Sequence, residues 1–419
     1  MNILFVHQNH PGQFREVMPR LIADGRHKAV FLTQREITEP PGYPVVSYKP
    51  AFAKPAQPNP YTEMFEGCAS AGVGAMRAAL ELKRRGFCPD LVVGHAGWGE
   101  LLMLKEVWPD VPVAGYFEYY FIAKGGLINS DPEFPSSPDI SAKLVTRNGN
   151  NLLNLVGCDA GFTASEWQRW THPEMFRSKI EVLHEGIRTD RLVPDHATPY
   201  NLGIGELRLT RDDEIVTYIA RNLEPARGFH TMLRALPKLQ KLRPKARVVV
   251  IGGDSVSYGA RLGDGKTFRQ LFTEELGDRV DWSRVHFVGN LPYDGLMTLL
   301  KISRCHVYLT VPFVVSWSFL EAMALEKTVV ASDVAPVRQF AENGKTALLV
   351  DFFDTNALAL KIADVLRHPD NFREIGRAAR QDMIARFDFQ TKCYPEFLRF
   401  MDRLVPGAIG SADGLKAAS

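Results

Sequence analysis

Short apolar runs alternate with segments of helical periodicity along most of the chain, and this alternation limits the available folds more than any other feature. A run of four to eight apolar residues is typical of a buried strand, whereas apolar positions three and four apart indicate a helix. Strands that alternate with helices predict a parallel sheet covered by helices on both faces. In the first half, the predicted strands are residues 3–6, 29–33, 45–48, 91–95, 113–117 and 159–165, with helices at 63–86 and 99–107.

The alternation stops at residues 192–212, which contain prolines and glycines but no periodic apolar pattern, and it then starts again. We therefore expect two consecutive α/β domains, 1–200 and 205–386, each with a doubly wound parallel sheet. A chain of 419 residues also exceeds the length that one hydrophobic core usually supports. A last helix, 387–405, and a flexible tail, 406–419, are expected to follow. In the second domain the predicted strands are 214–221, 246–252, 285–289, 306–311, 328–332 and 346–351, and the predicted helices are 228–240, 268–276, 293–302, 355–366 and 371–386.

Composition and charge exclude several classes of protein. The formal net charge of +2 gives no sign of a nucleic-acid binder. The five cysteines form no Cys-x-x-Cys pair, which favours a reducing, cytoplasmic setting. No apolar run approaches the roughly 18 residues of a membrane span, and the opening MNILFVH reads as a strand rather than a signal peptide. Peripheral membrane contact through the basic residues 83–85 stays open beside the alternative of a solvated helix end.

Residues 306–333 contain the pattern most informative about function. An apolar strand ends at Pro312, a loop leads to Ser318, and a helix and a second strand follow. Ser318 and Glu321 have the Ser-x-x-Glu spacing of a capping box, which predicts that the helix starts there. In a parallel sheet this helix start lies at the carboxyl end of a strand, where ligands bind. Its unpaired N–H groups and partial positive charge suit a phosphate.

A second candidate for phosphate binding is the loop after the first strand of the second domain. Arg221 and Arg227 flank this strand-to-helix turn, and guanidinium groups match phosphate oxygens in geometry and charge. We therefore predict that the pair binds a diphosphate, with two surface arginines as the alternative. Gly252 and Gly253 follow the next strand and would let a ligand approach the backbone, although a simple turn would also use them.

In the first domain, the candidate residues lie at strand ends. His95 ends a predicted strand and could bind a sugar hydroxyl or steady a reacting centre; a hydrogen bond to a neighbouring loop is the alternative. Gly12 precedes a helix and either allows close approach of a ligand or forms a tight turn. The acceptor-side candidates are His10, Glu118 and Tyr119, although aromatic residues at such positions often belong to the core.

With these motifs in the same order, the chain resembles family 4 glycosyltransferases of the GT-B fold over nearly its whole length. Pro11-Gly12 matches the glycine loop of that family, and residues 90–95 match its strand ending in histidine. Arg221 and Arg227-Gly228 occupy the basic pair of its G-R…E-P-x-K-G loop, with arginine for the usual lysine. Further matches are Ser165, HEGI at 184–187, VHFVGNLP at 285–292 and LEAMALEKTVVASDVAPVRQF at 320–340.

The resemblance implies a role for each matched residue. Arg221 and Arg227 would neutralise the diphosphate of the donor, and Glu321 would bind the ribose diol. The catalytic candidates are then His95, Arg221, Arg227 and Glu321, and the donor-binding candidates are Gly12, Gly253, Leu291, Ser316, Trp317, Ser318 and Glu321.

The resemblance also implies a reaction. A UDP- or GDP-linked sugar would be transferred to a glycan, lipid-linked or other acceptor, with retention at the anomeric carbon and without a metal or other cofactor. The chain has no Asp-x-Asp pair at a comparable strand end to hold a divalent ion, which fits that expectation. The last helix would cross back to the first domain.

One position departs from the family pattern. The family has two glutamates spaced E-x7-E, whereas Phe313 stands eight residues before Glu321. The leading hypothesis is a retaining glycosyltransferase of bacterial surface glycan, glycolipid or glycoconjugate synthesis. A non-catalytic nucleotide-sugar-binding partner subunit and a GT-B nucleotide-sugar epimerase are the alternatives.

Overall fold

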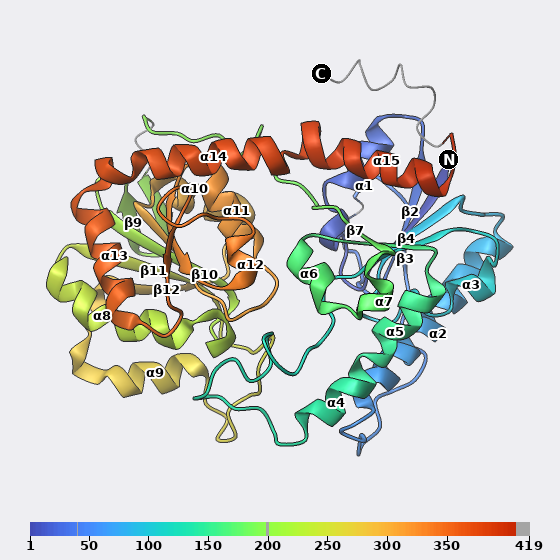
Figure 1. Ribbon diagram of the computed structural model, residues 1–419, viewed down its shortest axis with the longest axis horizontal. Helices are drawn as coiled ribbons and strands as arrows, with labels where there is room; N and C mark the ends of the chain where they lie inside the picture. Colours follow the sequence, from blue (N-terminus) through green and yellow to red (C-terminus); the bar gives the residue numbers. More distant parts are fainter. Residues whose placement is uncertain (40, 198–200, 408–419) are drawn as a thin grey trace. The chain divides into compact units, whose positions relative to one another are not determined.

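The chain forms two compact units, each built on its own parallel sheet (Figure 1). The computed structural model describes residues 1–39, 41–197 and 201–407. Unit 1 consists of residues 1–123, 137–186 and 389 onward, and unit 2 of residues 124–136 and 187–388. The α/β class predicted from the alternation is confirmed in both units.

Unit 1 contains, among the described residues, a seven-stranded sheet in the order β3-β2-β1-β4-β5-β6-β7, with every neighbouring pair parallel. Its strands are β1 (Asn2–Val6), β2 (Lys28–Thr33), β3 (Val45–Ser47), β4 (Leu91–His95), β5 (Val113–Tyr116), β6 (Ala160–Thr163) and β7 (Ile180–Val182). Its helices are η1 (Gly12–Phe14), α1 (Val17–Ala23), α2 (Glu63–Arg84), α3 (Leu104–Val107), α4 (Ile140–Arg147), α5 (Gly149–Gly157), α6 (Glu166–Thr171), α7 (Glu174–Arg177), the π-helix η6 (Phe389–Cys393) and α15 (Tyr394–Leu404).

The two faces of this sheet are covered by different helices, because successive side chains of a strand point to opposite sides. Ile3 and Phe5 of β1 pack in one buried cluster with residues of α1 and α15. Leu4 and Val6 pack in another with residues of α2, α3 and α5. The last helix therefore belongs to the core of the first unit, although it comes from the other end of the chain.

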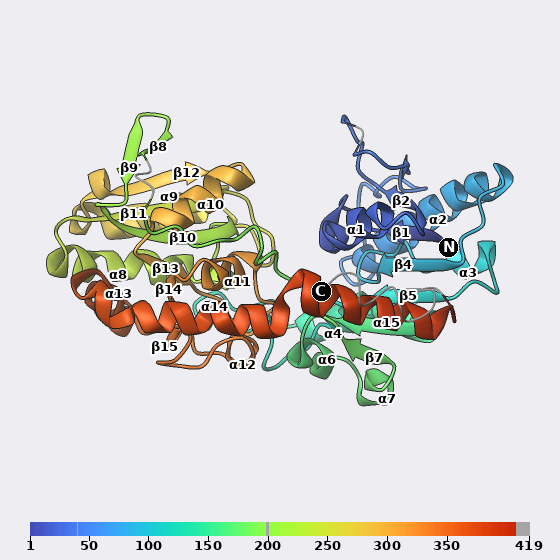
Figure 2. The same cartoon turned by 90° about the horizontal axis from the view of Figure 1, so that it is seen from above.

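Unit 2 has, within the described residues, a six-stranded parallel sheet in the order β12-β11-β10-β13-β14-β15, which can be followed in Figure 2. A hairpin, β8 (Asn201–Ile204) and β9 (Leu207–Thr210), precedes it. The strands are β10 (Glu214–Asn222), β11 (Ala246–Gly253), β12 (Val285–Gly289), β13 (Cys305–Tyr308), β14 (Thr328–Ser332) and β15 (Leu348–Val350). The helices are η2 (Pro225–Arg227), α8 (Phe229–Leu242), α9 (Phe268–Leu276), η3 (Gly277–Arg279), η4 (Trp282–Arg284), α10 (Tyr293–Ile302), α11 (Trp317–Ala324), α12 (Ala335–Arg338), α13 (Thr355–Arg367), η5 (Pro369–Phe372) and α14 (Arg373–Phe387).

Three expectations about the course of the chain need correction, and a fourth lies mostly outside the described residues. The first unit ends at Gly186 rather than near residue 200, and the stretch expected to be irregular contains the hairpin β8–β9. Residues 124–136 fold with unit 2 although their neighbours in sequence belong to unit 1. Most of the tail expected at 406–419 lies outside the described residues.

The helix expected at 99–107 is also shorter than predicted, since only Leu104–Val107 are α-helical. Gly99 has a φ of +103°, which side chains of L-residues rarely allow. A Cβ atom there would lie 2.0 Å from the carbonyl oxygen of Cys68 on α2. The chain therefore turns against α2 before it becomes helical.

Candidate functional site

Arg227 of unit 2 is held in place by three hydrogen bonds. It ends η2, immediately before Gly228 and α8, and its side chain is buried. Its Nη1 donates to Tyr308 Oη at 3.2 Å, Thr310 Oγ1 at 2.9 Å and the Val314 carbonyl at 3.0 Å. These acceptors come from the end of β13 and the loop that follows it. The guanidinium is thus fixed at the carboxyl edge of the sheet.

Two aromatic rings flank the same guanidinium. Its carbon lies 4.9 Å from the ring centre of Tyr258 and 5.3 Å from that of Phe313, and the two rings lie 4.8 Å apart. Burial alone would lower the pKa of Arg227, but the oxygens of Tyr308, Tyr258 and Glu224 together raise it. The group therefore carries a permanent positive charge at this edge.

The ring of Tyr258 is positioned by Glu224, which sequence reasoning did not single out. The Glu224 carboxylate is fully buried and accepts backbone hydrogen bonds from Ser257, Tyr258 and Gly259 at 2.9, 3.0 and 3.1 Å. Three donors on one carboxylate hold the loop against the strand-to-helix turn. The only sign of this role in the sequence is that the glutamate stands directly before the proline of that turn.

Arg221, the other predicted phosphate-binding arginine, is exposed and makes no hydrogen bond or ion pair with the part of the chain that the structure describes. It lies one residue before Asn222, whose register partner on β11 is Gly253. A Cβ atom at Gly253 would lie 2.7 Å from Asn222 Oδ1, so a larger residue there would displace that side chain. Leu291, which follows β12, packs with its side chain against a buried cluster of unit 2.

The N-terminus of α11 lies next to Arg227. Ser316 N donates to Tyr308 Oη at 2.8 Å, and the same Oη accepts from Arg227. The predicted capping box is wrong, because the helix is capped by Ser316 and not by Ser318. Ser316 has an extended backbone and accepts from Ser318 N at 3.4 Å, while Ser318 lies inside the first turn, one residue after Trp317. Tyr308 thereby joins the arginine to the helix start.

Glu321 is buried on α11 and does not cap the helix. Tyr293, the first residue of α10, donates from its Oη to Glu321 Oε1 at 3.0 Å. This bond orients the carboxylate. Tyr293 was not predicted as a site residue, because its position in the sequence gives no hint of the contact.

In unit 1, a chain of polar contacts links the ends of β1, β4 and β5. His7 Nε2 lies 2.6 Å from Gln13 Oε1, and Gln13 Nε2 donates to Glu118 Oε1 at 3.2 Å. The other oxygen, Glu118 Oε2, lies 3.4 Å from His95 Nε2. Sequence reasoning found His95 and Glu118 but missed His7 and Gln13, whose partners become visible only in the fold.

Hydrogen bonds to the backbone fix both imidazoles. His7 Nδ1 accepts from Asn9 N at 2.8 Å, and His95 Nδ1 accepts from Gly97 N at 2.9 Å. Each Nδ1 is therefore unprotonated in the neutral ring, which leaves the proton on Nε2. Burial and the nearby His95 lower the pKa of His7 to about 3. The bond from Gly97 is the loop contact considered as the alternative for His95.

Gly12, His10 and Tyr119 each make close contacts within unit 1. Gly12 has a φ of +53°, and a Cβ atom there would lie 2.5 Å from His7 Nε2. The side chain of His10 contacts Tyr43 Oη at 2.9 Å. Tyr119 is buried and stacks on Trp167, which fits the core role considered as the alternative.

An open surface cavity of about 780 Å³ lies elsewhere in unit 2, between α12 and α14. Its charged lining residues pair with one another, as in Asp333–Arg338 and Glu342–Lys345. None of Arg221, Arg227 and Glu321 lines it. The phosphate-binding candidates therefore do not belong to this cavity.

The described residues contain neither a metal cluster nor a membrane-spanning helix. They include no group of three or more His, Cys, Asp or Glu side chains arranged to hold a metal ion. They also include no helix that is both long and apolar enough to cross a bilayer.

Two family models match the chain, one on each half. The model described as "Glycosyl transferase family 4 group" matches residues 25–192. The model described as "Glycosyl transferases group 1" matches residues 206–382. The second match contains Arg221, Arg227 and Glu321.

Curated relatives are about a quarter identical to the chain over the residues that align. D-inositol 3-phosphate glycosyltransferase of Streptomyces avermitilis is 25% identical over 306 residues, which are 68% of this chain and 58% of that protein. A GDP-mannose-dependent alpha-(1-6)-phosphatidylinositol monomannoside mannosyltransferase of Mycolicibacterium smegmatis is 25% identical over 60% of this chain and 63% of its own length. The chain thus spans less than two thirds of either relative.

Solved structures show the same fold over nearly the whole chain. Sucrose-phosphate synthase from Thermosynechococcus elongatus has a TM-score of 0.69 at 18% identity and covers 96% of this chain and 99% of its own. Anabaena HepE in complex with UDP has a TM-score of 0.66 at 16% identity and covers 96% and 100%. The predicted GT-B architecture is confirmed by these similarities.

Proposed function

Because the chain belongs to the family 4 glycosyltransferases of GT-B fold, we propose that it transfers a sugar from a nucleotide-diphosphate sugar to an acceptor. The observation that carries this proposal is the link from Arg227 through Tyr308 to the N-terminus of α11. It combines a buried, permanently charged guanidinium with a helix start, and both favour phosphate oxygens.

In the proposed reaction, the bond between the anomeric carbon and the β-phosphate oxygen breaks, and a bond to an acceptor hydroxyl oxygen forms. The hydroxyl proton is released, and the anomeric configuration is retained. Arg227 and the exposed Arg221 stabilise the charge that develops on the departing diphosphate, with no metal ion. Glu321, oriented by Tyr293, binds the ribose diol.

The proposed donor base is uracil or guanine. UDP is bound in the HepE structure, and GDP-mannose is named in the mannosyltransferase relative. The proposed acceptor is a glycan, a lipid-linked molecule or another hydroxyl compound, in line with relatives whose names specify an inositol phosphate or a phosphatidylinositol mannoside. We place the acceptor at Glu118, because this carboxylate is partly exposed at a strand end of unit 1.

A non-catalytic nucleotide-sugar-binding subunit is the second candidate. Phe313 favours it, since this ring packs beside Arg227 at the position where a carboxylate is expected. The first candidate predicts turnover, and the second predicts tight binding without turnover.

The test is incubation of the full chain with a panel of UDP- and GDP-sugars and measurement of released nucleotide, with and without a crude acceptor extract. Acceptor-dependent release of one nucleotide supports the transferase. The test variant is Arg221→Met, which removes an exposed cation and should lower release without unfolding the protein. Nucleotide binding without release from any donor supports the binding subunit instead.

A further inference from the structure

Residues 124–136, here called the strap, fold with unit 2 although they lie between two segments of unit 1. The chain leaves unit 1 after Ala123 and re-enters it at Ser137. The strap is internally ordered, because Ser136 N donates to Asn129 Oδ1 at 3.0 Å and Phe134 N to the Asp131 carbonyl at 3.2 Å. Its own hydrogen bonds therefore give the strap a defined conformation.

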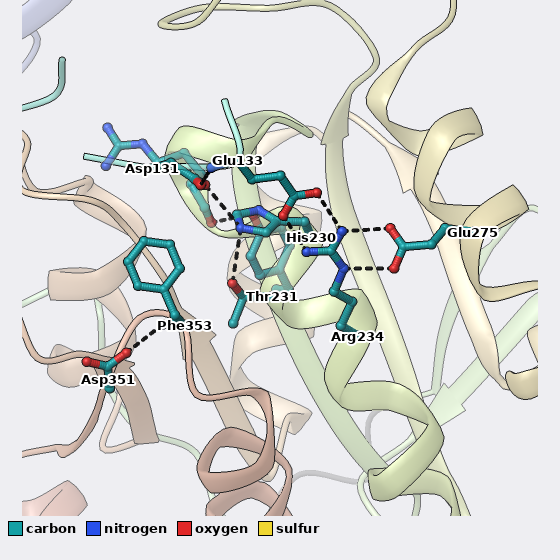
Figure 3. Close-up of polar contacts among 10 residues, drawn as sticks. Asp131, Glu133, His230, Thr231, Arg234, Glu275, Asp351 and Phe353 are labelled. Atoms are coloured by element: carbon teal, nitrogen blue, oxygen red, sulfur yellow. Dashed lines mark hydrogen bonds and ion pairs between the residues drawn. The ribbon is translucent and has the colours of Figure 1, made fainter. Parts of the chain in front are cut away.

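The first anchor of the strap is Asp131, which faces His230 of α8 (Figure 3). Asp131 Oδ2 lies 3.2 Å from His230 Nε2, and both side chains are buried. Burial alone would raise the pKa of Asp131, but the contact with His230, the Glu133 amide and Arg234 lower it below its usual value. The carboxylate is thus held in its charged form against α8.

The second anchor is Glu133, which shares Arg234 of α8 with Glu275 of α9 (Figure 3). Arg234 Nη1 and Nη2 donate to the two oxygens of Glu133 at 2.6 and 2.7 Å. Its Nε and Nη2 donate to the oxygens of Glu275 at 2.8 and 2.7 Å. One arginine therefore makes two bidentate pairs, one to the strap and one within the body of unit 2.

Apolar contacts complete the attachment. The Phe134 ring lies 5.7 Å from the ring of His230, 5.6 Å from that of Phe268 and 6.1 Å from that of Phe272. Edge-to-face geometry in all three pairs is favourable for aromatic rings. The strap is held on α8 and α9 by charge and by packing together.

The residues directly before the strap, 118–121, are held in unit 1 by hydrogen bonds. They include the acceptor-side candidates Glu118 and Tyr119. The carbonyl of Glu118 accepts from Gln168 Nε2 at 2.9 Å, and the carbonyl of Tyr119 accepts from Asn151 Nδ2 at 3.2 Å. Asn148 pairs with both the N–H and the carbonyl of Phe121, at 3.0 and 2.8 Å. The segment that leads into the strap is therefore the same backbone that carries Glu118.

Helix α8 connects the strap to the phosphate-binding candidate. It begins two residues after Arg227, and His230 and Arg234 lie on its first two turns. Both anchor points lie within the first two turns of this helix, so we expect a shift of the turn at Arg227 to move them with it.

We propose that the strap couples diphosphate binding at Arg227 to the acceptor-side loop at residues 118–121. The coupling rests on the proposed function, because it needs a nucleoside diphosphate at Arg227. The coupling would run through one element that is connected to both sites, α8 with the docked strap.

The test is amide hydrogen exchange of the full chain, with and without saturating UDP, and in parallel GDP. For the wild type we expect the bound nucleotide to slow exchange several-fold in peptides covering residues 118–136. For Asp131→Asn/Glu133→Gln we expect nucleotide affinity within about 2-fold of wild type and loss of the response at 118–123. The matched control is Glu275→Gln, which removes the other carboxylate from Arg234 and should keep the response.

The outcomes separate the coupling from the proposed function. A nucleotide that binds without changing exchange at 118–136 contradicts the coupling alone. The coupling is also contradicted if the double variant responds as the wild type does, or if Glu275→Gln loses the response equally. If neither UDP nor GDP binds, the proposed function fails and the coupling fails with it.

Discussion

The guanidinium carbon of Arg227 lies 5.3 Å from the ring centre of Phe313, the residue eight positions before Glu321. At that position the family pattern predicts a carboxylate, which would pair with the arginine and compete with a phosphate. A phenyl ring attracts the cation without neutralising it. The contact therefore orients Arg227 while leaving its charge available to a ligand.

Phe313→Leu tests this contact. The substitution keeps an apolar side chain but removes the ring face, and a cation–π contact contributes about 0.5–2 kcal/mol. We expect the affinity for the bound nucleoside diphosphate to fall about 2- to 30-fold in a calorimetric titration, with the nucleoside alone unaffected. A lower Tm with unchanged diphosphate affinity would mean that Phe313 serves packing only.

Glu321→Ala should weaken nucleotide binding more than it destabilises the fold. A hydrogen bond to a charged group contributes about 1.5–3 kcal/mol, so we expect a loss of roughly 10- to 100-fold in affinity. Tyr293→Phe is the matched control, because it removes only the partner of the carboxylate. If Glu321→Ala lowers Tm and leaves nucleotide affinity intact, the carboxylate has a structural role.

The protein should lose stability between pH 7.5 and pH 5.5. Burial lowers the pKa of His7 and of His306 to about 3 and that of His172 to about 4, against an ordinary value near 6.5. In this window the unfolded chain binds protons that the folded chain does not, so stability falls as the pH falls. Each histidine contributes about 1.4 kcal/mol over this range, and the three together about 4 kcal/mol.

Urea unfolding at the two pH values measures this loss. His306→Asn should reduce the pH dependence by about a third, whatever it does to stability at pH 7.5, because one of the three groups no longer titrates. An unfolding midpoint that does not change with pH would contradict the assignment of neutral, buried histidines.

The packing of α15 on unit 1 predicts a large effect at Phe400. This ring is buried beside Phe162 of β6, with the ring centres 5.4 Å apart. Phe400→Ala should cost about 3–5 kcal/mol of stability, whereas the neighbouring exposed Arg399→Ala should cost under about 0.5 kcal/mol. Equal unfolding midpoints for the two variants would show that α15 is not part of this core.

The sequence predicted the sheets well because buried strands are short apolar runs that local composition reveals. Each predicted strand is present, while β7, with only three residues, was missed. The strap could not be predicted, since its assignment to unit 2 depends on Asp131 and Glu133 meeting α8. Contacts between segments a hundred residues apart leave no periodic signal.

The candidate site was predicted only in part, because only some of its residues stand in patterns that are visible in the local sequence. Arg227 and Glu321 stand in recognisable local patterns at strand ends and helix starts. Glu224, Tyr258 and Tyr293 hold or flank them from elsewhere in the fold. The capping prediction failed because two serines, Ser316 and Ser318, stand close to the start of the helix. Only the backbone conformation shows that Ser316 is the one that caps it.

In the proposed function, unit 2 binds a nucleoside diphosphate through Arg227, Arg221 and the start of α11. Calorimetric titration of the full chain with UDP, GDP, uridine and guanosine tests it most directly, with Arg221→Met as the variant. We predict that one diphosphate binds at least about 10-fold more tightly than its nucleoside, and that Arg221→Met reduces that difference at unchanged Tm. Equal affinity for the nucleoside and its diphosphate, or no binding of either diphosphate, would contradict the account.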